Sequence, residues 1–264
     1  MSYANLRGTS FRYSGLQGAN FRGADLSMAN LGKSSPIGAN FSNAHLSMAN
    51  LSSSHISSAD FKYADLRGSN LADADFTASD FRYANLSLCN LQRANLSLSN
   101  LMGANLTRAD LRQCDAVGSD FSRASLNEAN LAGSNLSEAL LVGTEAIAAN
   151  LTDALLNEAN LTRSNLIGVN GQRASLCSCD AIATDLPAPT SPMPTLPAPI
   201  SAGPTLPAPS ACNLDNGCAA TSTAPSMPKA FCKPMFRAFS RPNQALTHHH
   251  RSDPEALFKH TPTR

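Results

Sequence analysis

Cysteine and histidine are the usual metal ligands in proteins, and two short groups of them stand out in this sequence. The phrase CSC contains Cys177 and Cys179, and a histidine run occupies residues 248–250. A zinc site needs three or four converging ligands, and neither group has partner ligands at a matching distance along the chain. We therefore predict no metal site and no cofactor, with Cys179 packed inside the fold and Cys177 facing outward.

Carboxylates are the commonest acids and bases of active sites, but here they follow a repeat instead of forming a catalytic pair. Ten Asp residues occupy one fixed position of that repeat, where Asn otherwise stands. Short side chains of this kind bond nearby backbone amides at turns. The sequence thus predicts structural carboxylates, no catalytic residue and a protein that is not an enzyme.

Lysine, arginine and tyrosine recur near a spacing of twenty residues and form the group that we interpret as a candidate binding surface. We call it the basic stripe, and it consists of Arg22, Lys62, Tyr63, Arg82, Tyr83, Arg123 and Arg163. Such a row could contact phosphates or an acidic protein partner. Because Asp60, Asp80 and Asp120 neutralise part of its charge, an acidic protein is favoured over nucleic acid. The default interpretation of such a row remains a solvated face without any partner.

The composition limits the class of protein further. Formal net charge is +1 and charged residues make up 15%, unlike a strongly charged nucleic-acid binder or a DNA mimic. The seven cysteines are odd in number and irregularly spaced, which favours a reducing compartment over a disulfide framework. The N-terminus has no signal-peptide pattern and no stretch approaches 18 apolar residues. We expect a cytoplasmic protein with no membrane span.

Proline divides the chain into three parts. Of 16 prolines, only Pro36 lies within residues 1–186. Residues 187–228 contain the LPAP phrases and are predicted to be a Pro-rich extended linker. Residues 229–264 carry seven Lys and Arg residues and are predicted to be a basic, disordered tail.

Residues 4–186 are built from five-residue units of the form small residue, Asn or Asp, Leu, and two freer positions. Counting from Leu6 in steps of five to Leu186 gives 37 central positions, of which 32 are Leu, Phe or Ile. Five residues advance an α-helix by about 500°, so successive leucines would share no face. An odd spacing on a flat strand sends them to opposite sides. A solenoid that turns after each unit brings every central residue back to one axis.

Longer periods indicate four units per coil. Phe21, Phe41, Phe61, Phe81 and Phe121 are separated by multiples of 20. Ten of the 15 glycines stand two residues after a central position, where a type II turn needs a positive φ. Pro36 at a central position predicts a local bulge, and the weaker pattern after Leu140 predicts looser C-terminal coils.

The units ANLRG, ANFRG, ADLRG and ANLTR resemble those of the pentapeptide repeat family. That resemblance implies an all-β fold, namely a right-handed quadrilateral parallel β-helix. It brings no catalytic residues.

The function that we expect is non-enzymatic: a rigid rod that acts as a scaffold or binds a partner protein. The resemblance also implies two alternative functions. One is that of a DNA mimic that binds type II topoisomerase and confers quinolone resistance, and the other is that of a bacterial effector delivered into a host. The partner's identity stays open. A homodimer through the C-terminal end of the rod is a further hypothesis, because the last coil leaves backbone edges unpaired.

Overall fold

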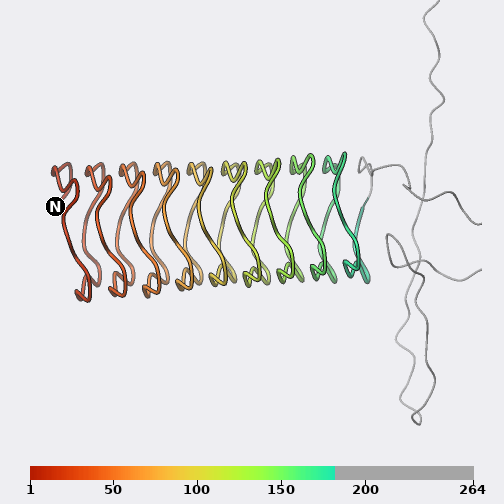
Figure 1. Cartoon of the computed structure of the whole chain (residues 1–264), viewed down its shortest axis with the longest axis horizontal. Helices are drawn as coiled ribbons and strands as arrows, with labels where there is room; N and C mark the ends of the chain where they lie inside the picture. Colours follow the sequence, from red (N-terminus) through yellow and green to blue (C-terminus); the bar gives the residue numbers. More distant parts are fainter. Residues whose placement is uncertain (182–264) are drawn as a thin grey trace, which may run out of the picture.

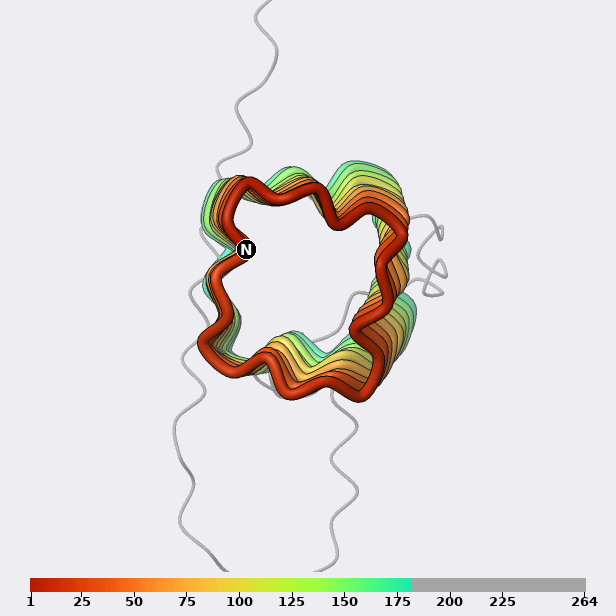
Figure 2. Tube along the Cα trace, turned by 90° about the vertical axis from the view of Figure 1, so that its left-hand side faces the viewer, coloured from red at the N-terminus to blue at the C-terminus, as the bar shows by residue number. Residues whose placement is uncertain are grey.

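Residues 1–181 form a straight, four-sided solenoid, as seen in a computed structural model that describes this part of the chain (Figure 1). Each coil takes 20 residues, and the view along the rod shows four sides and four corners (Figure 2). Parallel bridges join residues that are 20 apart, for example Asn30 with Asn50 and Asn50 with Asn70. The prediction of four units per coil is therefore confirmed. The predicted linker 187–228 and tail 229–264 lie outside the described residues.

The β-structure within residues 1–181 differs from that expected of a β-helix. Each bridge is isolated at a single residue, and this part of the chain contains no continuous strand or helix. The reason is the short unit, since two of every five residues belong to a turn. One residue per side is left to pair with the coils before and after it.

The turns share one conformation. The amide of Thr9 donates to the carbonyl of Leu6 at 3.1 Å, and this bond recurs in most units. The residue two after the centre has φ near +60° in every unit, and in 26 units it is not glycine. Positive φ is thus adopted by many residue types here, and glycine gives room where a side chain of the preceding coil covers the turn. A Cβ on Gly68, for example, would lie 2.7 Å from the sulfur of Met48.

Leu and Phe at the central positions fill the interior, and small residues two positions earlier line it. Central hydrophobic residues from Phe21 to Phe121 have 0% exposure. Phe21, Phe41, Phe61 and Phe81 stack in one column, with successive ring centroids 4.7–5.0 Å apart. We call the side of the rod with these residues the phenylalanine side. Burying one such side chain stabilises the fold by about 1.5–3 kcal/mol.

Buried hydroxyl groups and the Asn or Asp positions complete the hydrogen bonding. The Oγ of Ser99 donates to the carbonyl of Phe76 in the preceding coil at 2.8 Å. Among the described residues no buried side-chain polar atom lacks a partner. The Oδ1 of Asn20 accepts from the amide of Arg22 at 3.0 Å, and the amide of Asn150 reaches Asn130 at 3.1 Å. The predicted turn bonding by Asn is confirmed, and Asn side chains of adjacent coils also bond each other.

The predicted bulge at Pro36 is wrong. Pro36 is buried at its central position, and the turn bond from Ala39 to its carbonyl is kept at 3.1 Å. Proline lacks the amide that other central residues donate to the next coil, so this one bond is lost without any change of register. The C-terminal coils do show slightly weaker burial, since Leu141, Ala146 and Leu151 are 3–7% exposed.

Candidate functional site: a basic corner of the rod

All seven residues of the basic stripe lie on the corner that follows the phenylalanine side. Arg22, Lys62 and Arg82 take the first turn position, and the other four take the second, with φ of 57–59°. Because coils stack in register, side chains 20 residues apart are neighbours along this corner. The structure divides the stripe into two parts. Arg22 to Tyr83 form an N-terminal part, and Met102 with Gly103 separate it from Arg123 and Arg163.

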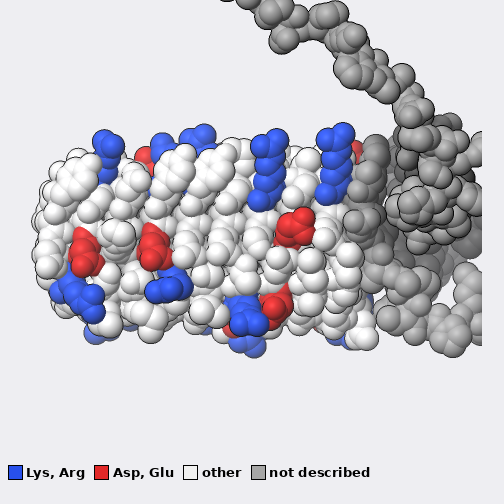
Figure 3. Space-filling view, turned by 90° about the horizontal axis from the view of Figure 1, so that it is seen from above, with Lys and Arg blue, Asp and Glu red and all other residues white. Residues whose placement is uncertain are grey.

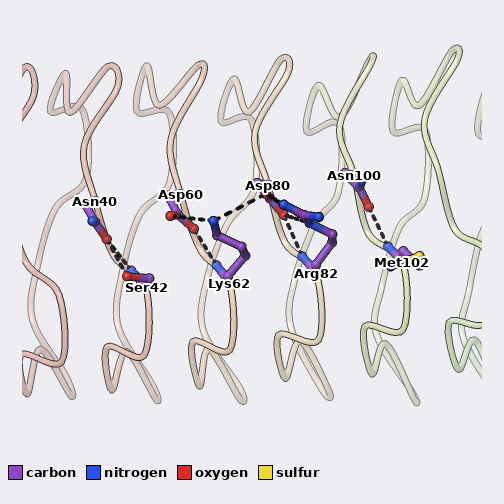
Figure 4. A network of polar contacts seen from close by, with 8 residues as sticks. All are labelled: Asn40, Ser42, Asp60, Lys62, Asp80, Arg82, Asn100 and Met102. Carbon is purple, nitrogen blue, oxygen red and sulfur yellow. Dashed lines mark hydrogen bonds and ion pairs between the residues drawn. The ribbon is translucent and has the colours of Figure 1, made fainter.

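Two cations of the N-terminal part are held by carboxylates on the phenylalanine side (Figure 4). The Nζ of Lys62 lies 3.1 Å from Asp60 and 4.0 Å from Asp80, one coil later. Arg82 binds Asp80 through Nε at 3.0 Å and through a terminal nitrogen at 2.7 Å. These pairs neutralise the centre of the stripe and hold the two side chains along the surface.

The carboxyl of Asp80 has a lowered pKa. Partial burial acts to raise this pKa, but hydrogen bonds from Arg82 and the charges of Arg82 and Lys62 outweigh it. A carboxyl with a lowered folded-state pKa stabilises the fold above its unfolded pKa, and this stability is lost as pH falls through the folded-state value. The ion pairs of this site therefore weaken in acid.

Replacing Asp80 by Asn should flatten the pH dependence of stability in acid. The wild-type free energy of unfolding should fall as pH drops below about 4, and part of that fall should disappear in Asp80→Asn. Urea titrations at pH 2.5–6 measure it. Asp65→Asn is the matched control, because Asp65 stands at the same repeat position but forms no ion pair in the described part of the chain. If the free energy of unfolding depends on pH equally in wild type and in Asp80→Asn, the carboxyl of Asp80 does not have a lowered pKa in the folded protein.

Two stacked tyrosines stand beside these ion pairs. The rings of Tyr63 and Tyr83 lie 5.4 Å apart at 9°, and the residues are 59% and 48% exposed. Tyr83 extends over the next coil, where a Cβ on Gly103 would lie 2.6 Å from its ring. Gly103 therefore makes room for the ring, and the stack presents a rigid aromatic surface to solvent.

A shallow hollow adjoins the stack on its N-terminal side. Its volume is about 320 Å³, and Arg22, Lys62 and Tyr63 stand around it with Asn40, Ser42, Asn43 and Asp60. Ser42 leaves room for it, because this serine stands between the longer Arg22 and Lys62 of the adjacent coils, and Gly23 precedes Asn43 at the second turn position. The hollow was not predicted from the sequence, although one short residue between two long ones was a usable signal.

The remaining cations of the stripe have no internal counterion. Arg22, Arg123 and Arg163 take part in none of the ion pairs that the described residues form. Figure 3 shows separate basic side chains along the upper margin of one view of the rod, above a largely uncharged area with scattered acidic and basic side chains. The stripe thus has a neutralised centre at Lys62 and Arg82, with free positive charge on either side of it.

The cysteines of the CSC phrase point apart. Cys177 is exposed, whereas the sulfur of Cys179 donates to the carbonyl of Leu156 at 2.6 Å. The predicted positions, one outward and one inward, are confirmed. Residues 1–181 hold no group of three or more side chains suited to a metal ion, and the histidine run 248–250 lies outside them.

Stacked pentapeptide coils with a side-chain surface at each corner define a class of solenoid repeat proteins. Models of pentapeptide repeats match residues 1–35, 37–71, 69–108, 104–143 and 147–186. The chain belongs to the pentapeptide repeat family.

The chain is also similar to solved structures of pentapeptide repeat proteins. The chain is 31% identical to HetL, a pentapeptide repeat protein involved in heterocyst differentiation regulation from the cyanobacterium Nostoc sp. strain PCC 7120. That match covers 69% of this chain and 87% of HetL, with a TM-score of 0.39. A trypsin-treated form of QnrB1, a plasmid-mediated fluoroquinolone resistance protein, is 17% identical over 69% of this chain and 89% of QnrB1, with a TM-score of 0.43. No curated protein matches the chain. None of the residues that the structure describes forms a helix able to cross a membrane.

Proposed function

We propose that this protein is a non-enzymatic binding rod whose N-terminal part of the basic stripe receives an acidic partner protein. The observation that carries the proposal is the exposed Tyr63–Tyr83 stack beside the hollow and the ion-paired Lys62 and Arg82. Tyrosine and arginine dominate the binding energy of protein interfaces. A rigid stack loses little conformational entropy on binding, which makes it a suitable anchor.

The charges around the tyrosine stack favour an acidic protein over a nucleic acid as the binding partner. Arg22 is free to pair with a partner carboxylate at the edge of the hollow. Lys62 and Arg82 already contact Asp60 and Asp80, and those carboxylates would repel a continuous phosphate backbone. Discrete carboxylates on a protein surface can instead approach Arg22 while the tyrosines bury apolar area.

A DNA mimic that binds type II topoisomerase is the second candidate. Such a mimic requires a continuous negative surface. Here residues 1–186 hold 16 acidic against 13 basic residues, and seven acid–base contacts in the described part pair six of the acids with cations. A supercoiling assay with micromolar protein separates the two proposals, since inhibition or protection of gyrase would favour the mimic. Delivery into a host as an effector is a third proposal, to be tested with a translocation reporter.

The test of the leading proposal compares two corners of the rod. A tagged full-length chain identifies a stoichiometric partner, and titration calorimetry then measures its dissociation constant. Tyr63→Ser with Tyr83→Ser should weaken binding by about 100-fold, as expected for two anchor residues of about 1.4 kcal/mol or more each. Serine already occupies this turn position in other coils, for example Ser53 and Ser58, so the fold should persist.

The control is Met48→Ser with Leu88→Ser. These residues take the same turn position on the next corner and are 64% and 57% exposed, so equal loss of apolar surface occurs away from the stripe. Binding should change less than threefold. If both double variants bind alike, or if the protein turns over a substrate, the proposal is wrong.

The winding of the rod is also part of the proposal. We infer a right-handed solenoid, as the family resemblance implies. The path in Figure 2 supports it, because the chain turns clockwise as it recedes from the N-terminal end.

A further inference from the structure

The C-terminal coils carry an unusual residue in the middle of the phenylalanine side. The outward row of this side contains Asn100, Asp120, Leu140 and Asn160 in successive coils. Leu140 replaces the Asn or Asp of the repeat and is 43% exposed. Its backbone still bridges Asp120 and Asn160, so the fold does not need a leucine there.

The two corners that border Leu140 carry opposite charges. The corner that follows it holds Arg123 and Arg163, and the corner that precedes it holds Glu138 and Glu158. None of these four side chains takes part in the ion pairs formed within residues 1–181. An apolar centre between a positive and a negative edge therefore lies open to solvent.

We propose that this face binds a second copy of the chain, with the two rods parallel and related by a two-fold axis along their length. Such a rotation places the positive edge of one rod opposite the negative edge of the other, and Leu140 opposite its own counterpart. An antiparallel pairing of the same faces would bring the two positive edges together. Charge complementarity thus selects the parallel arrangement.

The axial positions of the charges agree with this arrangement. Arg163 follows Glu158 by five residues, a quarter coil, or about 1.2 Å along a rod with coils about 4.8 Å apart. Glu138 follows Arg123 by fifteen residues, or about 3.6 Å. The stem of Arg123 leans in the required direction, since its Cγ lies 3.9 Å from where a Cβ of Gly143 would stand. Both charge pairs are within reach of flexible side chains.

The turn residues outside the charged coils fit as well. On the preceding corner, Gly38, Ser58 and Ala78 are small, and Tyr63 of the basic stripe would face Ser58 and Ala78 across the two-fold axis, whereas Leu98 on the same corner is large and 67% exposed. Nine coils at about 4.8 Å and a side of at most about 16 Å give an upper bound of roughly 700 Å² per copy, near the ~800 Å² of a specific interface.

Asp120 opposes the association, and it differs from Asp60 and Asp80 of the same outward row because those two are paired with Lys62 and Arg82, whereas Asp120 takes part in no ion pair within residues 1–181. In the parallel pair its carboxylate would face its own counterpart one coil from Leu140, and like charges at an interface repel. Substitutions at Asp120 and at Leu140 should therefore change the affinity of the dimer in opposite directions. Asp120→Asn, which restores the commonest residue of the repeat, should strengthen the dimer, whereas Leu140→Asn should weaken it.

The experiment is sedimentation equilibrium of the full-length chain at 10–500 µM, together with three variants. Leu140→Asn should raise the dimer dissociation constant at least tenfold, and Asp120→Asn should lower it about threefold or more. Leu155→Asn is the matched control, because Leu155 makes the same replacement on the adjacent side and is also 43% exposed. It should leave the constant unchanged.

Charge exchange gives a second, independent readout. Arg123→Glu with Arg163→Glu, and Glu138→Arg with Glu158→Arg, should each weaken self-association at least tenfold, and an equimolar mixture of the two variants should recover it. Arg7→Glu with Arg67→Glu on another corner controls for net charge. A chain that stays monomeric at 500 µM overturns the proposal, as does a dimer that all these variants share. The second copy would cover Tyr63 and Tyr83, so it would compete with the acidic partner of the proposed function. None of these substitutions is at either tyrosine, so variants that lose the dimer should still bind that partner, and loss of one activity can be told from loss of the other.

This side-by-side dimer differs from a dimer through the C-terminal end of the rod. Residues 182–264 follow the last described coil and lie outside the described part of the chain. The hypothesis of an end-to-end dimer therefore stays a prediction. A cysteine introduced by Asn160→Cys, on the outward row of the phenylalanine side, should form a disulfide-linked dimer in the side-by-side arrangement and not in an end-to-end one.

Discussion

Replacing Phe61 by alanine is expected to lower the free energy of unfolding by about 3–5 kcal/mol. The ring is fully buried and stacks on Phe41 at 4.8 Å and on Phe81 at 4.7 Å, each at 5°. Phe76 contacts its edge at 5.9 Å and 74°. The variant loses the transfer free energy of the ring, leaves a cavity in a closely packed interior, and removes three ring contacts at about 0.5–1.5 kcal/mol each.

The neighbouring coils make this loss hard to repair. Each coil is tied to the next by backbone hydrogen bonds on all four sides, so the walls cannot collapse inward around the cavity without breaking them. Because stability in a solenoid depends on nearest-neighbour coil interfaces, a defect in a middle coil weakens the two interfaces that it shares. Urea denaturation followed by circular dichroism measures the change.

Two matched variants separate the ring contacts from simple burial. Phe121 occupies the same side and is equally buried, but it takes part in none of the ring contacts among the described residues. Phe121→Ala should therefore destabilise the rod less than Phe61→Ala. Phe61→Leu, which installs the commonest central residue, should cost less than about 1.5 kcal/mol. Equal losses for Phe61→Ala and Phe121→Ala would show that the column of rings adds nothing.

Cysteine reactivity is the second prediction with a large expected effect. Burial raises the pKa of Cys89 and of Cys114 to about 12, and each residue is 1% exposed. The thiolate is the reactive form, so at pH 8 the fraction of thiolate in either residue is about 10⁻⁴. Compared with a free thiol of pKa about 8.5, alkylation should be slower by about 10³-fold or more. Cys177, which is exposed, should react readily.

Iodoacetamide labelling of the native protein with peptide mapping by mass spectrometry tests this at each cysteine separately. The pH dependence has a definite sign, because a raised thiol pKa keeps Cys89 and Cys114 protonated up to about pH 12, and their labelling should rise tenfold per pH unit between 7 and 10. In 8 M urea all the cysteines should react at similar rates, which serves as the control. Rapid labelling of Cys114 in the native protein would show that the small residue two positions before each central residue does not point inward.

The interior of the rod was predictable from the sequence because it depends on local spacing. A central Leu or Phe every five residues, such as Leu6 and Phe21, requires a turn after each unit, and the recurrence of Phe at 20 residues determines four units per coil. The order of small residue, Asn and Leu likewise predicts which side chain points inward. Pro36 is the exception, because a proline at a central position removes one amide hydrogen bond to the next coil without displacing the backbone.

The outer surface depends on contacts that no spacing specifies. The sequence placed Lys62 and Arg82 on one corner, but the three-dimensional structure shows that Asp60 and Asp80 neutralise them while Arg22 stays free. It also brings together Arg123, Leu140 and Glu158, which belong to different units of the repeat.

The sequence by itself therefore determined the coil, its interior and the corner on which each outward residue lies. Tertiary structure decided which charges are paired, where the surface is hollow, and which opposite charges border one exposed leucine. The physical reason is that interior positions are selected by burial, which follows the period of the backbone. The contacts of exposed side chains depend on their rotamers and on their distances to residues of adjacent coils. Both are determined only once the coils are stacked.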